Sequence, residues 1–367
     1  MAAIGRGGYS RIRVGVARLA IGCQRFHHPV LHGWRAQHDG QLAQFLLQLV
    51  RPDRLRIARQ TAAGVLTQTL SAELFGFGPF SILLPQALEG LASILVLYLL
   101  VRRVFGTEAG LFAALLLALT PIAVAVDRSN NTDTGLVLTL LLAAWALTRA
   151  VETGRWSFLL LAAGLVGIGF NVKMLVAFGV LPVFILLYLA GAQIPLRRRT
   201  GHLAVAGVVL AAVSLSWTAV YELTPAQNRP FVDSTRTNSM LELVVGHNGI
   251  QRFVRRARNL QDAPVDTAAS AASTGGVPDR PAAPGAGLPP SRDYAPAGPL
   301  RLAAPHLAAQ MGWLFPLALI GGIAAWARIR PFRPLAREHL SLALWAGWAL
   351  CYGIVFSAAA GLFMPIT

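Results

Sequence analysis

The stretch that decides the fold is 109–192, in which four apolar runs alternate with short polar patches. The runs read AGLFAALLLALTPIAVAV (109–126), TGLVLTLLLAAWAL (134–147), WSFLLLAAGLVGIGF (156–170) and MLVAFGVLPVFILLYLAGA (174–192). The two polar patches are DRSNNTD (127–133) and NVKM (171–174), which overlaps the start of the last run, and Lys173 is the only lysine in the chain. Runs this apolar are typical of membrane spans. We therefore expect each polar patch at a membrane face.

Composition supports the same class of protein. Hydrophobic residues make up 55% of the chain and charged residues only 13%, whereas soluble proteins carry about 25% charged residues. The mean hydropathy is +0.55. We predict an all-α, polytopic integral membrane protein with eight transmembrane helices and one long loop on the outer face. The expected spans are 80–101, 109–126, 134–147, 156–170, 174–192, 203–220, 311–326 and 340–363.

Charge in the short loops predicts the orientation. Cytoplasmic loops of membrane proteins are enriched in Lys and Arg. Alternation of the spans places eleven arginines on one side and only Arg128 and Lys173 in the short loops of the other. The eleven are Arg102, Arg103, Arg149, Arg155, Arg197, Arg198, Arg199, Arg328, Arg330, Arg333 and Arg337. Both polar patches, and the loop 221–308, are thus predicted to face outward.

The net charge of +16 first raises nucleic acid as a partner. The basic residues are spread along the chain, however, and no basic helix interleaved with aromatic residues occurs. We predict no nucleic-acid partner and assign the charge to arginines beside anionic membrane lipids.

Differences in residue composition divide the chain into five segments. Segment 1–68 holds ten of the 32 basic residues and four of the eight histidines, but no membrane span, no signal-peptide core and no metal-ligand spacing. Segment 69–220 is the expected transmembrane core. Segment 221–261 is a mixed outer loop, 262–308 a flexible Pro-, Ala- and Gly-rich insertion, and 309–367 the C-terminal spans.

Five passages together resemble a known family. They are Gln68-Thr-Leu-Ser-Ala-Glu-Leu-Phe-Gly-Phe-Gly78, Leu84-Pro-Gln-Ala-Leu-Glu-Gly90, Asp127-Arg-Ser-Asn-Asn-Thr-Asp133, Gly169-Phe-Asn-Val-Lys-Met174 and 241–249. Through them, 68–363 resembles bacterial members of glycosyltransferase family 39, the protein-mannosyltransferase-like and aminoarabinose-transferase-like enzymes of the GT-C class.

The resemblance implies sugar transfer at the outer face of the bacterial cytoplasmic membrane. A mannose-like hexose or an aminoarabinose-like pentose would pass from a polyprenyl-phosphate donor to a protein or glycolipid acceptor. Such a reaction needs a carboxylate to take the proton of the acceptor hydroxyl and cations to stabilise the departing phosphate. The resemblance implies no particular cofactor, and it does not decide whether the reaction needs a divalent cation. A non-catalytic membrane scaffold and a transporter are the alternatives.

Residue roles follow from the same resemblance. Asp133 matches the family's second acidic position, with an acceptor-positioning or metal-positioning role, and Asp127 is the second candidate acid. Lys173 matches the basic residue beside the donor phosphate, where Arg128 would assist. A loop over the site would contribute His247 and Asn248 as acceptor or sugar contacts.

Each of these residues also has a structural interpretation. Asp133 could cap the helix that follows it, and Asp127 could form a surface ion pair with Arg128. Lys173 could anchor its helix at the lipid headgroups. Glu89 stands inside a span, where an ionisable group is costly and therefore a functional suspect. It could also pair with the arginines of the next loop.

The chain departs from the family pattern at both ends. Family members begin with a span and an outer loop that carries the first catalytic acid, followed by an Asp-Lys-Pro-Pro-like passage. Segment 1–67 offers none of these, and His38-Asp39-Gly40 is the nearest match. The family continues past the position of Thr367. We hypothesise that the first sixty-odd residues derive from a shifted reading frame and that activity is impaired.

Overall fold

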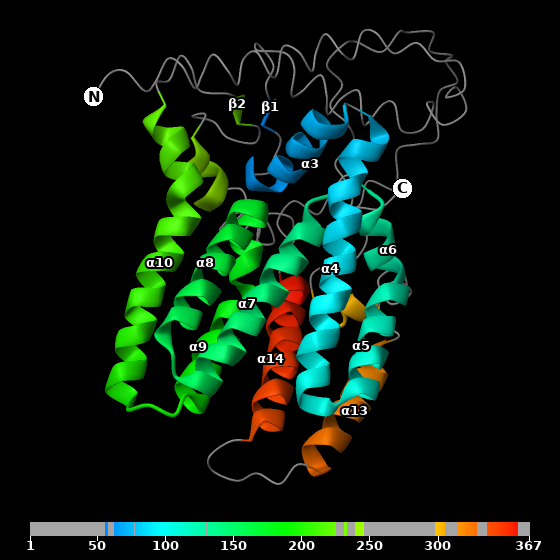
Figure 1. Cartoon of the computed structure of the whole chain (residues 1–367), viewed down its shortest axis with the longest axis vertical. Coiled ribbons are helices and arrows are strands. Elements are labelled where there is room, and N and C mark those ends of the chain that lie inside the picture. The colour runs from blue at the N-terminus through cyan, green and yellow to red at the C-terminus, as the bar shows by residue number, and fades with distance from the viewer. Residues whose placement is uncertain are drawn as a thin grey trace, which may run out of the picture.

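The computed structural model describes residues 56–57, 62–76, 78–129, 131–224, 231–232, 239–245, 298–304, 314–328 and 336–358. Almost all of them are helical, which confirms the all-α prediction. The exception in this part of the chain is a two-residue parallel pairing of β1 (Arg56–Ile57) with β2 (Phe231–Val232). A first helix, α3 (Ala62–Phe75), lies across one end of the bundle and crosses the segment boundary predicted at 68 (Figure 1).

The remaining helices run up and down between two ends of the bundle (Figure 1). In order they are α4 (Pro79–Phe105), α5 (Thr107–Leu119), α6 (Pro121–Asp127), α7 (Asp133–Thr153), α8 (Trp156–Lys173), η2 (Met174–Val180), α9 (Leu181–Gly191), α10 (Leu196–Leu223), η5 (Arg301–Ala303), α13 (Leu314–Arg328) and α14 (Arg337–Ala358). Length and composition qualify five described helices as membrane spans, or six if α5 and α6 form one bent span. In that count α8, η2 and α9 form a single 36-residue helix.

The chain nevertheless reverses inside that 36-residue stretch. The rings of Phe170 and Phe178 stack with centroids 4.9 Å apart, although eight residues of a continuous α-helix would separate them by about 12 Å. Met174 stands at the turn with φ 49°, the one positive φ of a non-glycine residue in the described ranges. The stretch is therefore two antiparallel arms. Each of the eight predicted spans thus falls on an apolar helical segment, although α13 is shorter than the roughly 20 residues that cross a bilayer.

A sharp bend separates α5 from α6. Pro121 begins α6, and the two helices meet at 64°. Proline lacks the N–H that would continue the helix. The hydroxyl of Thr120 donates instead to the carbonyl oxygen of Leu116 at 2.6 Å. The bend turns α6 so that Asp127 ends it beside α4 and α7.

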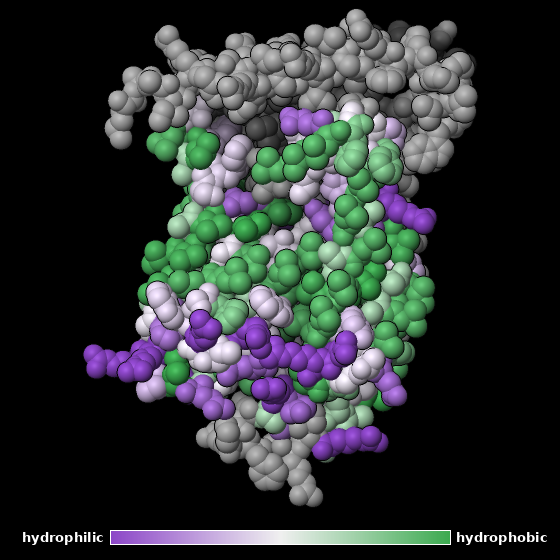
Figure 2. Space-filling view, viewed as in Figure 1, coloured by the Kyte–Doolittle hydropathy of each residue, from purple (hydrophilic) through white to green (hydrophobic). Residues whose placement is uncertain are grey.

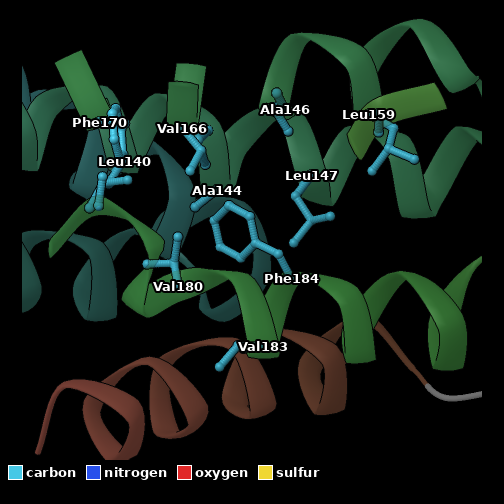
Figure 3. Packing of buried hydrophobic residues seen from close by; sticks show 14 of the residues in the cluster. Leu140, Ala144, Ala146, Leu147, Leu159, Val166, Phe170, Val180, Val183 and Phe184 are labelled. Atoms are coloured by element: carbon cyan, nitrogen blue, oxygen red, sulfur yellow. The ribbon is translucent and has the colours of Figure 1, made fainter. Parts of the chain in front are cut away.

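The core of the bundle forms around α7. Its alanines Ala143, Ala144, Ala146 and Ala150 are fully buried, and small residues let neighbouring membrane helices approach closely. Figure 3 shows the ring of Phe184 directed from α9 towards α7. Large apolar side chains on the outside of α4, α5, α10 and α13 remain exposed, and they form the broad apolar surface of Figure 2, as expected for helices facing lipid.

Charged residues gather at one end of the bundle, where Figure 2 shows a hydrophilic belt. There α4 ends in Arg102 and Arg103, α8 begins after Arg155, and α10 and α14 begin with arginines in the first turn. The arginine belt comprises Arg102, Arg103, Arg149, Arg155, Arg197, Arg198, Arg199, Arg328 and Arg337. Arg330 and Arg333 lie outside the described residues. The two polar patches lie at the opposite end.

Candidate functional site

The two polar patches meet in space. Lys173 is the last residue of α8, Asp133 is the first of α7, and the ammonium of Lys173 forms an ion pair with the carboxylate of Asp133. Their side chains are 38% and 32% exposed. The pair is therefore held by the bundle yet open to a ligand.

The capping interpretation of Asp133 is wrong. Thr132 occupies the N-cap position of α7 without a side-chain capping bond. The side chain that satisfies the start of the helix is Asn131, whose Oδ1 accepts a hydrogen bond from the backbone N–H of Asp133 at 3.2 Å. The carboxylate of Asp133 is left to face Lys173.

Asp127 points back towards the same helix. Its Oδ1 accepts a hydrogen bond from the hydroxyl of Thr134 at 2.8 Å, one residue beyond Asp133. Arg128 is exposed and forms no ion pair with any residue that the structure describes. The predicted Asp127–Arg128 surface pair is thus not formed, and Arg128 does not join the cluster.

From the sequence, Glu89 was a functional suspect or a partner of the next loop's arginines, and the structure places it beside Asp127. Glu89 lies about ten residues into α4, and its carboxylate accepts a hydrogen bond from Thr67 of α3 and interacts electrostatically with Asp127. It cannot pair with Arg102 and Arg103, because these arginines stand in the last turn of α4, about 20 Å further along the same helix. In the sequence, the residue that could have indicated this placement is Gly90, which directly follows Glu89 in the Leu84–Gly90 passage.

Two glycines create the space for the acids. A Cβ on Gly90 would lie 2.7 Å from the carboxyl carbon of Asp127, and a Cβ on Gly135 would lie 3.0 Å from Oε2 of Glu89. The first separation is too short for a real side chain, and the second is so tight that Glu89 would have to shift. Glycine therefore lets α4, α6 and α7 bring two carboxylates together.

Asn171, in the second patch, has a structural task. Its Nδ2 donates to the carbonyl oxygen of Val213 at 2.6 Å and to that of Gly167 at 3.2 Å. A Cβ on Gly167 would meet Val213 at 2.8 Å. Asn171 thus ties α8 to α10 where the helices pack closely, and this contact holds Lys173 at the end of α8.

The acids do not make a metal site by themselves. Mg²⁺ and Ca²⁺ take six or more oxygen ligands, and within the described ranges no three His, Cys, Asp or Glu side chains are grouped to hold an ion. No step is therefore assigned to a cation. The predicted contacts His247 and Asn248 lie outside the described residues.

The fold and this cluster define a multi-pass helical membrane protein with a polar site at one membrane face. Residues 62–217 match the dolichyl-phosphate-mannose-protein mannosyltransferase family. This region carries α3 to α10, and it confirms the resemblance to GT-C glycosyltransferases predicted from the sequence.

Two proteins of Bacillus subtilis (strain 168) and one solved structure are similar to the chain. It is 49% identical to YkcB over 186 residues, 51% of the chain, and 35% identical to YycA over 347 residues, 80% of the chain; both are provisionally assigned mannosyltransferases. A structure of ArnT from Cupriavidus metallidurans bound to undecaprenyl phosphate superposes with a TM-score of 0.55 at 18% identity, over 83% of the chain. This likeness shows the shared fold.

The matches cover only part of these proteins. The aligned regions represent 26% of YkcB, 50% of YycA and 46% of the ArnT chain. The chain thus spans about half the length of the relatives it matches, or less.

Proposed function

We propose that this chain carries the membrane core of a glycosyltransferase that uses a polyprenyl-phosphate sugar donor. The observation that carries the proposal is the ion pair of Lys173 with Asp133, next to the Asp127–Glu89 carboxylates, at the end of the bundle opposite the arginine belt. By the positive-inside rule that end faces outward from the bacterial cytoplasmic membrane.

In this proposal the acids and the lysine divide the reaction between them. A carboxylate of the Asp127–Glu89 pair takes the proton of the acceptor hydroxyl, whose oxygen bonds to the anomeric carbon of the sugar. The bond from that carbon to the phosphate oxygen breaks, and the electron pair leaves with the lipid phosphate. Lys173 stabilises the growing negative charge there. Asp133 keeps Lys173 oriented through their ion pair.

The nature of the donor and acceptor rests on the relatives. YkcB and YycA are assigned to mannosyl transfer, and the ArnT structure was solved with undecaprenyl phosphate. A mannose-like hexose on a polyprenyl phosphate is accordingly the first donor to test, with an aminoarabinose-like pentose second. A protein or glycolipid hydroxyl is the proposed acceptor.

The test uses the full chain reconstituted in vesicles with undecaprenyl-phosphate-[¹⁴C]mannose. We expect radioactivity to pass from the lipid to protein, glycolipid or water, and Lys173→Gln to lower the rate about 100-fold, as removal of a group that stabilises developing charge does. Arg198→Gln, at the opposite end, is the matched control. Equal rates in all three proteins would exclude Lys173 from the reaction, whereas a wild type that shows neither transfer nor donor binding would support the scaffold role instead.

A further inference from the structure

A cleft that opens to solvent lies at the arginine-belt end between α4, α7, α9 and α14. It lies far from the carboxylate cluster, because α4 and α7 each run the length of the bundle between them (Figure 1). Its mouth is formed by Arg103, Glu152 and Arg337, and its wall includes Leu100, Leu147 and Leu344.

The mouth of the cleft has an excess of positive charge. Glu152 is 12% exposed, forms an ion pair with Arg103, and lies 3.8 Å from Arg149 and 3.7 Å from Arg337. One carboxylate thus faces three guanidinium groups, which leaves a net charge of +1 on the residues that line the mouth and +2 when the neighbouring Arg149 is included. Each guanidinium carries five N–H donors, and the Arg337 side chain is 64% exposed. Donors remain for an external anion.

The interior of the cleft is apolar. Leu147 and Leu344 are almost completely buried, and Leu340 and Val104 complete the wall. The indole Nε1 of Trp345, which also lines the cleft, is buried and has no hydrogen-bond partner among the described residues. A ligand that fits this cleft has an anionic head and an apolar tail.

We infer that this cleft binds one anionic phospholipid from the surrounding membrane. The lipid phosphate contacts Arg103 and Arg337, and the start of an acyl chain lies along the leucine wall. The cleft also lies at the right depth in the membrane. Arg103 and Arg337 stand at the ends of their helices, where lipid headgroups are expected. Free inorganic phosphate would contact only the arginines at the mouth and would make no contact with the apolar wall. Glu152 holds the arginines together and weakens the site by its own charge.

Native mass spectrometry of the full chain, released from an equimolar mixture of phosphatidylglycerol and phosphatidylcholine, tests the site. The wild type is expected to retain phosphatidylglycerol in preference to phosphatidylcholine. Arg337→Gln should lower that preference about five-fold, the effect of one arginine near an anionic lipid. Arg198→Gln removes an exposed arginine of the same belt that does not line the cleft, and it should leave the preference unchanged.

Two further variants separate the cleft from general surface charge. Thr148→Phe fills the cleft without changing its charge and should release the lipid, whereas Glu152→Gln should strengthen the preference for phosphatidylglycerol. Millimolar inorganic phosphate should not displace the lipid. Equal effects of Arg337→Gln and Arg198→Gln, retention by Thr148→Phe, or displacement by inorganic phosphate would overturn the inference. A thermal melt of each variant confirms that it is folded.

Discussion

Lys173 at the end of α8 and Asp133 at the start of α7 form an ion pair, although 40 residues separate them in the sequence. Each charge also lies at the helix terminus that favours it, since carboxylates stabilise helix N-termini and ammonium groups C-termini. Both side chains are about one third exposed. An ion pair so accessible to water contributes little to folding.

We therefore predict that Asp133→Asn and Lys173→Gln lower the free energy of unfolding by no more than about 1 kcal/mol, whereas both slow sugar transfer, Lys173→Gln by about 100-fold. The exchange Asp133→Lys with Lys173→Asp keeps a pair of opposite charges but puts a carboxylate at the proposed phosphate position, so transfer should not return. Thermal unfolding and transfer are measured on the same preparations. A large loss of stability with unchanged transfer would make the pair structural.

The second prediction concerns Gly90, where an added methyl group would press against the carboxyl carbon of Asp127 at 2.7 Å. Gly90→Ala should cost about 1–3 kcal/mol, the usual penalty of overpacking, and should reduce transfer by displacing Asp127. Gly164→Ala in α8 is the matched control, because nothing lies within 4 Å of its Cβ position. That control should be neutral or stabilising. Equal melting temperatures for the two variants would contradict the close approach.

Glu89→Gln should make the protein more stable and less active. It keeps the shape of the side chain but removes a charge whose burial in the bundle is costly and which Asp127 repels in addition. Transfer should fall about 100-fold or more if the Asp127–Glu89 pair accepts the acceptor proton. Glu108→Gln, on the exposed first turn of α5, is the control. A destabilised but fully active Glu89→Gln protein would show that Glu89 only supports the fold.

Asn171→Leu should weaken the contact between α8 and α10. Leucine has a similar size but cannot donate to the carbonyl oxygen of Val213, and hydrogen bonds between membrane helices contribute about 1 kcal/mol. Ser216→Ala, whose hydroxyl bonds to Val213 within its own helix, should change stability less. If the two variants melt at the same temperature, the link between α8 and α10 does not depend on Asn171.

Much of the fold follows from the sequence, because membrane spans are local features. Hydropathy over about 20 residues identifies each span, and loop arginines predict which ends lie together, so the helices and the arginine belt were predictable. The resemblance also selected Asp127, Asp133 and Lys173. The roles of His247 and Asn248 and the properties of residues 1–55, 58–61 and 246–297 remain predictions, since these residues lie outside the described ranges.

The sequence by itself thus determined the class of protein, the apolar segments and the two polar patches. Only the tertiary structure decided which side chains meet: Glu89 with Asp127, Asp133 with Lys173, and the three arginines around Glu152. Apart from Arg149 and Glu152, which both lie in α7, these pairs join different helices, and they depend on helix rotation, the bend at Pro121 and the space left by Gly90 and Gly135. Hydropathy carries no information about them, because it measures how each segment interacts with lipid and not which face it turns to its neighbours.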